Sequence, residues 1–166
     1  METVKKPKQK KTATKPVKPS SKQVEKKVVR KFINRLPVAQ LSRMSSDAKI
    51  ELIKGGISKN DLEALKEQTG LGYEILSHIL SISRPSLINK KGEDKFNQPV
   101  SDRVVALADI YSNGYAVFDD KDRFNNWMIK PNRTLGGKAP IDLLDTSYGM
   151  ENVKHLIGRI AYGVYS

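Results

Sequence analysis

The chain has 166 residues, of which 38% are hydrophobic and 29% are charged, and its formal net charge at pH 7 is +12. This length allows one ordinary domain or two small ones with a modest core. The absence of cysteine excludes disulfides and thiolate metal sites, and only two histidines, His78 and His155, remain for a metal cluster. We therefore expect no metal and no cofactor.

The positive charge is concentrated at the start of the chain. Residues 1–35 hold 13 lysines and arginines against two glutamates, whereas residues 36–166 hold 17 basic and 16 acidic residues. Because residues 1–35 contain few large apolar side chains, burial cannot offset the entropy cost of ordering them, and we interpret them as a basic, disordered arm. The arm either contacts nucleic-acid phosphates without sequence preference or serves as a solubilising leader.

The first 37 residues also lack the apolar block of a secretory signal, and no run of about 18 apolar residues occurs in the chain. We therefore expect a cytoplasmic protein. Near the end of the arm, Val24, Val28 and Phe32 recur at helical spacing, which favours a short helix before Leu36 and Pro37.

Two short helices are predicted next. The first follows Ser45 or Ser46, carries Ile50 and Ile53 on one side, and ends at Gly55. The second begins after Ser58 as N-cap, carries the apolar Leu62 and Leu65, and ends at Gly70.

The following segment has the layout of a helix-turn-helix. A helix over residues 73–80 is followed, after a connection of about three residues, by a helix that Ser83 caps and that tolerates Pro85 in its first turn. In such a pair the second helix enters the DNA major groove. The candidate base-reading and phosphate-binding residues are Ser83, Arg84, Ser86, Asn89, Lys90, Lys91 and Lys95. The alternative is a helical bundle with a solvated basic end.

Two longer apolar patterns follow. A helix is predicted from about residue 99 to residue 112, with Asn113-Gly114 as its end. A further helix starts after Asp119 or Asp120 and stops before Pro131, with Trp127 on its apolar side. We expect Trp127 to pack in the core.

The last third of the chain contains a loop and a final amphipathic helix. Gly136, Gly137 and Lys138 lack the glycine spacing and the hydroxyl of a phosphate-binding loop, so they predict a tight turn before a short helix over residues 140–144. The final helix carries an apolar face from Val153 onward and ends at Gly163. The apolar and aromatic tail beyond it either folds back or inserts into a partner.

No catalytic arrangement is recognisable. Both histidines are expected to be solvated or satisfied structurally, and the aspartates at 119, 120 and 122 lack calcium-loop spacing. We therefore do not expect an enzyme.

The run from Asn125 to Ser166 resembles the toxin-binding domain of the Xre/MbcA/ParS antitoxins. The matching residues, in order, are Trp127, Pro131, Asn132, Leu135, Gly136, Gly137, Pro140, Leu143, Gly149, Val153, Leu156, Arg159 and Gly163. The preceding half is similar to the Xre-type helix-turn-helix of the same family. Two features depart from that pattern: Ser81 replaces a turn glycine, and Ile88-Asn89 replaces an aromatic–basic pair.

The resemblance implies a type II antitoxin that neutralises a RES-domain, NAD-degrading toxin and represses its own operon by binding operator DNA. It implies no active site in the chain itself. The tail would occlude the toxin's NAD pocket, with Arg159, Tyr162, Gly163, Val164, Tyr165 and Ser166 as the toxin-binding residues. Because operator repeats usually reflect dimeric readers, we also expect a homodimer within a larger toxin–antitoxin complex.

The expected fold is therefore all-α. A basic arm (1–35) precedes an Xre-like helix-turn-helix domain (46–115) and a small helical toxin-binding domain (116–166). Two other readings stay open: a stand-alone transcription regulator whose C-terminal domain only dimerises or senses a ligand, and a structural adaptor that does not read DNA.

Overall fold

The computed structural model describes residues 36 and 38–163, so the predicted arm and the last three residues lie outside it. Within the described residues the chain is helical and contains no strand; one isolated β-bridge joins Ser58 to Lys95. The elements are α2 (Val38–Leu41), α3 (Ser46–Gly55), α4 (Lys59–Thr69), α5 (Tyr73–Leu80), α6 (Arg84–Asn89), α7 (Gln98–Phe118), α8 (Lys121–Met128), η1 (Arg133–Leu135), η2 (Pro140–Leu143) and α9 (Ser147–Ala161).

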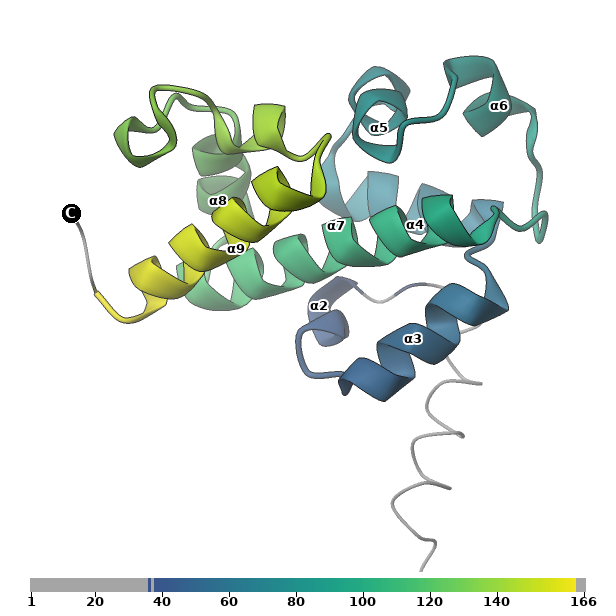
Figure 1. Ribbon diagram of the computed structural model, residues 1–166, viewed down its shortest axis with the longest axis horizontal. Coiled ribbons are helices and arrows are strands. Elements are labelled where there is room, and N and C mark those ends of the chain that lie inside the picture. Colours follow the sequence, from purple (N-terminus) through teal and green to yellow (C-terminus); the bar gives the residue numbers. More distant parts are fainter. Residues whose placement is uncertain (1–35, 37, 164–166) are drawn as a thin grey trace, which may run out of the picture.

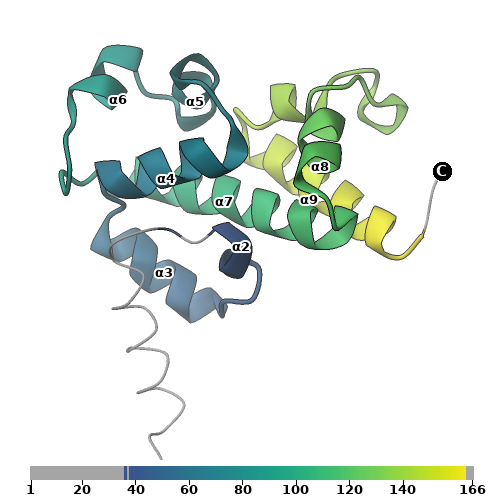
Figure 2. The ribbon, with the colours of Figure 1, turned by 180° about the vertical axis from the view of Figure 1, so that it is seen from behind.

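Helix α7 is the axis of the molecule (Figure 1). Helices α2 and α3 pack on one side of it, α5 and α6 lie on the opposite side, and α8 and α9 surround its C-terminal half (Figure 2). Five of its hydrophobic side chains are at most 1% exposed and form the centre of one continuous core: Val104, Leu107, Ala108, Ile110 and Tyr111.

Helix α7 is longer than its sequence predicts. The expected end at Asn113-Gly114 is wrong, because the helix continues to Phe118. At Gly114 a Cβ atom would lie 2.1 Å from the ring of Phe124, so this glycine allows α8 to pack closely against α7. Trp127, half-buried beside it, stacks on Phe124 with ring centroids 5.7 Å apart. Its expected packing against the core is confirmed.

Helix α3 differs from its prediction in its end and its buried face. Gly55 is its last residue, and Gly56, with φ 77°, takes the cap position that was expected for Gly55. Leu52 is buried, whereas Ile50 is 45% exposed. Because Lys49 pairs with Asp109 of α7, the face at positions 49, 52 and 53 points toward α7, and Ile50 points away.

The capping prediction for α4 agrees with the structure, whereas Tyr162 takes the cap position of α9 that was expected for Gly163. Ser58 and Asp61 form a reciprocal capping box, and Gly70 adopts the left-handed conformation at the end of α4. Gly163, with φ 69°, follows α9. Among the described residues, no helix combines the length and apolar content needed to cross a membrane.

Candidate nucleic-acid and partner interfaces

The turn between α5 and α6 brings the two helices into a helix-turn-helix arrangement. Ser81 adopts a left-handed conformation, φ 51°, which lets the chain turn without a glycine. Ser83 is the N-cap of α6: its hydroxyl accepts a hydrogen bond from the Ser86 backbone N–H at 3.3 Å and lies 2.8 Å from the Ser86 hydroxyl. The side chains of Ser83 and Ser86 therefore hold the start of α6.

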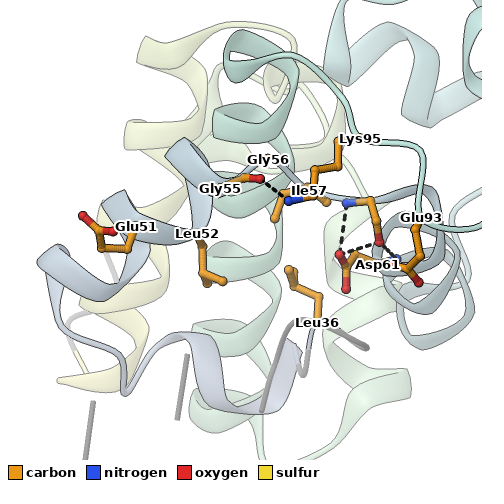
Figure 3. A pocket seen from close by; sticks show the side chains of 10 residues that line it. Leu36, Glu51, Leu52, Gly55, Gly56, Ile57, Asp61, Glu93 and Lys95 are labelled. Atoms are coloured by element: carbon orange, nitrogen blue, oxygen red, sulfur yellow. Dashed lines mark hydrogen bonds between the residues drawn. The ribbon is translucent and has the colours of Figure 1, made fainter. Parts of the chain in front are cut away.

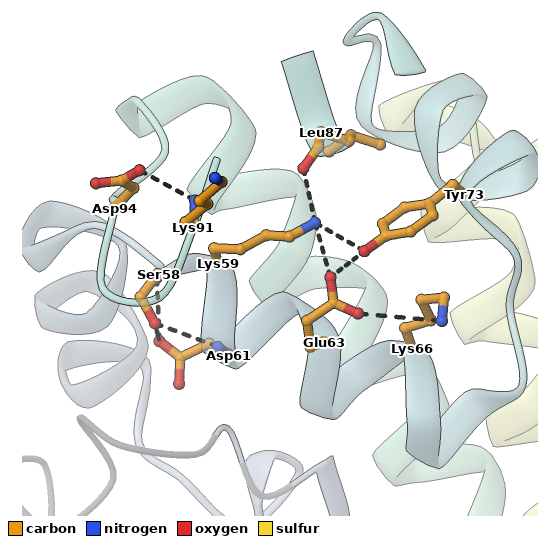
Figure 4. A network of polar contacts seen from close by, with 9 residues as sticks. All are labelled: Ser58, Lys59, Asp61, Glu63, Lys66, Tyr73, Leu87, Lys91 and Asp94. Atoms are coloured by element: carbon orange, nitrogen blue, oxygen red, sulfur yellow. Dashed lines mark hydrogen bonds and ion pairs between the residues drawn. The ribbon is translucent and has the colours of Figure 1, made fainter. Parts of the chain in front are cut away.

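Helix α6 is held on its inner side by Leu87, which is fully buried, and by a polar network (Figure 4). The Lys59 ammonium donates hydrogen bonds to the Leu87 carbonyl at 2.7 Å and to the Tyr73 hydroxyl at 2.8 Å. It also pairs with the Glu63 carboxylate at 2.7 Å, and the Tyr73 hydroxyl donates to the same carboxylate. Three helices thus meet at one buried lysine.

The network keeps both of its main charges. Burial disfavours the charged form of Lys59, but its hydrogen bonds to Glu63 and Tyr73 outweigh burial and raise the pKa of the ammonium. Burial likewise opposes the charge on Glu63, but hydrogen bonds from Lys59 and Tyr73 lower the pKa of this carboxyl. The carbonyl at the end of α6 therefore faces a cation at neutral pH, which suits the helix dipole.

Three of the predicted DNA contacts are exposed: Arg84 and Asn89 on α6, and Lys91 just after it. Within the described part of the chain, the side chains of Arg84, Asn89 and Lys91 make no hydrogen bond or ion pair. Lys90 and Lys95 are more constrained. Lys90 donates to the Lys95 carbonyl at 2.7 Å, and Lys95 donates to the Gly55 carbonyl at 2.5 Å. Arg84, Asn89 and Lys91 are thus available to a ligand without rearrangement.

In the C-terminal part, the family-like motif builds a scaffold. The Asn132 side chain accepts a hydrogen bond from the Thr134 backbone N–H at 2.9 Å, and the Asn132 carbonyl accepts one from Gly137 at 2.9 Å. Gly136 and Gly137 both have positive φ, 67° and 82°, in this turn, as predicted. At Gly149 a Cβ atom would lie 1.8 Å from the Leu143 carbonyl oxygen, so α9 can begin directly against η2. Here glycine is required for packing.

The glycine turn and α9 enclose an open cleft of about 440 Å³. Gly136 and Lys138 contribute from the loop, and His155 and the half-buried Arg159 contribute from α9. Tyr162 follows α9 and is 87% exposed. The structure thus places the predicted Arg159 and the motif residue Gly136 in one cleft. Val164, Tyr165 and Ser166 lie outside the described residues.

The remaining motif residues have structural positions. Pro131 follows α8 directly, and Pro140 opens η2 and is buried. Trp127 and Ile160 line a second, shallow groove of about 760 Å³ together with Lys130. The sequence alone did not indicate this groove, because its residues come from three separate helices.

A small cavity of about 80 Å³ lies between α3 and the start of α4 (Figure 3). Asp61 lines it, and one of its carboxylate oxygens accepts hydrogen bonds from Ser58 while the other, also buried, has no hydrogen-bond partner. The volume suits a few water molecules rather than an organic ligand. No cluster of metal-ligating side chains occurs among the described residues. Both histidines are exposed, and His155 lies 3.9 Å from Glu151.

These features define a helical DNA-binding protein of the helix-turn-helix class with a second small helical domain. The sequence model of the antitoxin Xre-like helix-turn-helix domain matches residues 48–109, and that of the antitoxin Xre/MbcA/ParS C-terminal toxin-binding domain matches residues 113–163. The chain therefore belongs to the Xre/MbcA/ParS-type antitoxins.

Three curated relatives agree with this assignment. An "Antitoxin Xre" of Photorhabdus laumondii is 37% identical over 76 residues, 45% of this chain and 51% of that protein, so this match spans about half of the relative. A "Prs ADP-ribosylating antitoxin" of a Sphingobium species is 29% identical over 76% of this chain and 86% of its own length. An "Antitoxin Xre" of Yersinia enterocolitica is 27% identical over 70% of this chain and 80% of its own.

Proposed function

We propose that this antitoxin neutralises a RES-domain, NAD-degrading toxin by occluding the toxin's active site with its C-terminal region, and that it represses its own operon. The observation that carries the proposal is the position of Tyr162. This aromatic side chain projects, 87% exposed, from the end of α9, in the region that matches a toxin-binding domain. An exposed aromatic side chain is a suitable anchor for a pocket in a partner.

The cleft between the glycine turn and α9 supports the same role. Arg159 contributes a guanidinium that pairs well with a carboxylate or a carbonyl of a toxin, and Lys138 adds a second positive charge on the opposite wall. Gly163, Val164, Tyr165 and Ser166 complete the proposed occluding segment. In this proposal the chain acts by binding, has no catalytic residue and needs no cofactor.

Operon repression rests on α6. In this proposal Arg84 and Asn89 read guanine and adenine, and Lys91 binds phosphate. Ser83 and Ser86, which hold the start of α6, would lie at the DNA backbone. Lys90 and Lys95 would join the phosphate contacts by leaving their carbonyl partners. A homodimer, with one α6 per half-site, and a cytoplasmic location belong to the same proposal.

The name of the Sphingobium relative refers to ADP-ribosylation, a reaction for which NAD is the usual donor. NAD loss is therefore a readout for both kinds of toxin partner. A RES-domain toxin would degrade NAD without labelling a protein, whereas an ADP-ribosylating toxin would transfer the group to one. Labelled NAD distinguishes the two outcomes.

Two variants separate toxin neutralisation from operator binding. Deleting residues 162–166 leaves all of α9 in place and should restore NAD loss by the bound toxin while DNA affinity is unchanged. Arg84→Ala should lower operator affinity about tenfold or more while toxin neutralisation is unchanged. Tyr148→Ala, which removes an equally exposed tyrosine at the start of α9, is the control. Full neutralisation by the truncated chain would contradict occlusion by the tail.

A further inference from the structure

The exposed face of α6 contains an apolar side chain that the charged contacts leave unexplained. Ile88 is 50% exposed, although it is next to the fully buried Leu87. Leu87 is the buried side chain of α6, so Ile88 is not needed for packing in the core. Exposing this isoleucine to water on a six-residue helix has a free-energy cost. Contact with a partner would remove that cost.

The neighbours of Ile88 indicate what that partner is. Arg84 lies four residues before Ile88 and therefore on the same side of the helix, and Asn89 is adjacent on the outward face. Lys91 follows immediately. The isoleucine is thus an apolar point within a basic surface, and this charge favours DNA over an apolar protein surface.

The DNA major groove offers one prominent apolar group, the C5-methyl of thymine. An A·T pair shows in the same groove the adenine N6 and N7 atoms that an asparagine side chain binds. The neighbouring Ile88 and Asn89 therefore suit the thymine methyl group and the adenine edge of one A·T pair. Arg84 suits guanine. All three side chains are exposed on one short helix that Lys59 and Leu87 hold in place.

We propose that Ile88 is a specificity-determining residue that reads a thymine methyl group in the operator. The inference rests on the proposed DNA-reading role of α6 and adds the identity of one base. It predicts a thymine in each half-site whose methyl group, and not only its hydrogen-bonding edge, contributes to affinity.

The test replaces thymine by uracil, which removes only the methyl group. Duplexes are first selected from a random library with the full chain, and each thymine of the selected sequence is then replaced singly. For the wild-type chain, uracil at the contacted position should weaken binding about fourfold for each half-site that carries it, the effect of burying one methyl-sized group. Ile88→Ala should bind the thymine duplex about as weakly as the wild type binds the uracil duplex, and should lose its sensitivity to uracil at that position.

Ile129→Ala is the matched control, because Ile129 is 59% exposed but lies after α8, far from α6 in the chain. It should retain the uracil penalty. If no uracil substitution weakens binding, or if Ile88→Ala keeps the same penalty, Ile88 does not read the methyl group. If the full chain selects no sequence at all, the DNA-reading function fails as well, so the two failures are distinguishable. A change of oligomeric state in Ile88→Ala without a uracil effect would instead assign this side chain to a contact between copies.

Discussion

At the scale of single residues, Gly114 and Gly149 show how packing can require glycine within a helix, and at Gly114 the sequence pattern was misleading. Both lie in regular helix, where glycine costs about 1 kcal/mol relative to alanine. Each nevertheless brings another part of the chain closer than a Cβ atom would allow, Phe124 in one case and the Leu143 carbonyl in the other. A glycine after an asparagine suggests a helix end, but here it marks a helix crossing.

Gly114→Ala should therefore destabilise the protein. The added Cβ would overlap the ring of Phe124, which is fully buried among other aromatic rings and cannot move freely, so we expect a loss of about 1–3 kcal/mol in the free energy of unfolding. Urea denaturation followed by circular dichroism measures it.

The control for this substitution is Gly158→Ala. Gly158 also lies in a helix, but a Cβ atom there would meet nothing within 4 Å, so alanine should be neutral or stabilise by up to about 1 kcal/mol. Equal effects of the two substitutions would mean that the contact between Gly114 and Phe124 does not constrain the fold.

At the scale of the helices, the sequence predicts the elements well where the signals are local. The caps Ser58, Ser83 and Gly70 were all identified from residue type and spacing, because capping depends on neighbours within four residues. The inner face of α3 could not be identified in this way, because Ile50 and Leu52 are both strongly apolar. Only the position of Asp109 on α7 decides which of the two is buried. Such long-range contacts leave no local pattern.

The candidate site divides in the same way. The exposed positions of Arg84 and Asn89 on α6 follow from the spacing of two helices, and their base-reading role stays a proposal. The role of Lys59 could not be predicted from the sequence, because a lysine in the first turn of α4 looks solvent-exposed. Only the fold brings it to Tyr73 and to the Leu87 carbonyl. The cleft around Arg159 likewise joins a loop to a helix about 20 residues away.

The buried network beneath α6 leads to a pH-dependent prediction. Because the pKa of Glu63 is lower in the folded protein than in the unfolded chain, its stabilising contribution is present above about pH 4.5 and is lost as the pH falls below that value. Glu63→Gln should therefore lower stability at pH 7, and its difference from the wild type should shrink toward pH 3.

Urea midpoints of the wild type and Glu63→Gln across this pH range measure the difference. Glu67→Gln, an exposed glutamate on the same helix, is the control and should follow the wild type throughout. A difference between Glu63→Gln and the wild type that stays constant from pH 7 to pH 3 would mean that the carboxylate charge is not what holds the network.

At the scale of the whole molecule, α7 joins the two functional regions. It runs unbroken from residue 98 to residue 118, through the predicted boundary at 115/116, so that boundary stays a prediction. Asp109 of α7 bonds Lys49 of α3 at 2.7 Å and Lys154 of α9 at 2.6 Å. Arg103 of α7 donates to the carbonyls of Ile79 and Asp145. The helix-turn-helix part and the C-terminal part therefore share polar contacts as well as a core.

Asp109→Asn should weaken this connection. The asparagine keeps the shape but loses the charge that both lysines face, and we expect a loss of about 1–2 kcal/mol, because each lysine is partly exposed and regains water. Asp102→Asn, an exposed position on the same helix, should change the free energy of unfolding by less than about 0.5 kcal/mol. Equal stability of Asp109→Asn and the wild type would show that these ion pairs do not join α3 and α9 energetically.

The central claim is that this chain neutralises a toxin that consumes NAD, and the most direct measurement is made on the complex itself. The tagged chain is purified gently from its native cell, any stoichiometric partner is identified by mass spectrometry, and NAD is assayed after the two proteins are separated. The account predicts one tightly bound partner that consumes NAD once it is free and stops when the chain is added back. A chain that purifies alone, or with DNA only, would contradict the account and identify a stand-alone regulator instead.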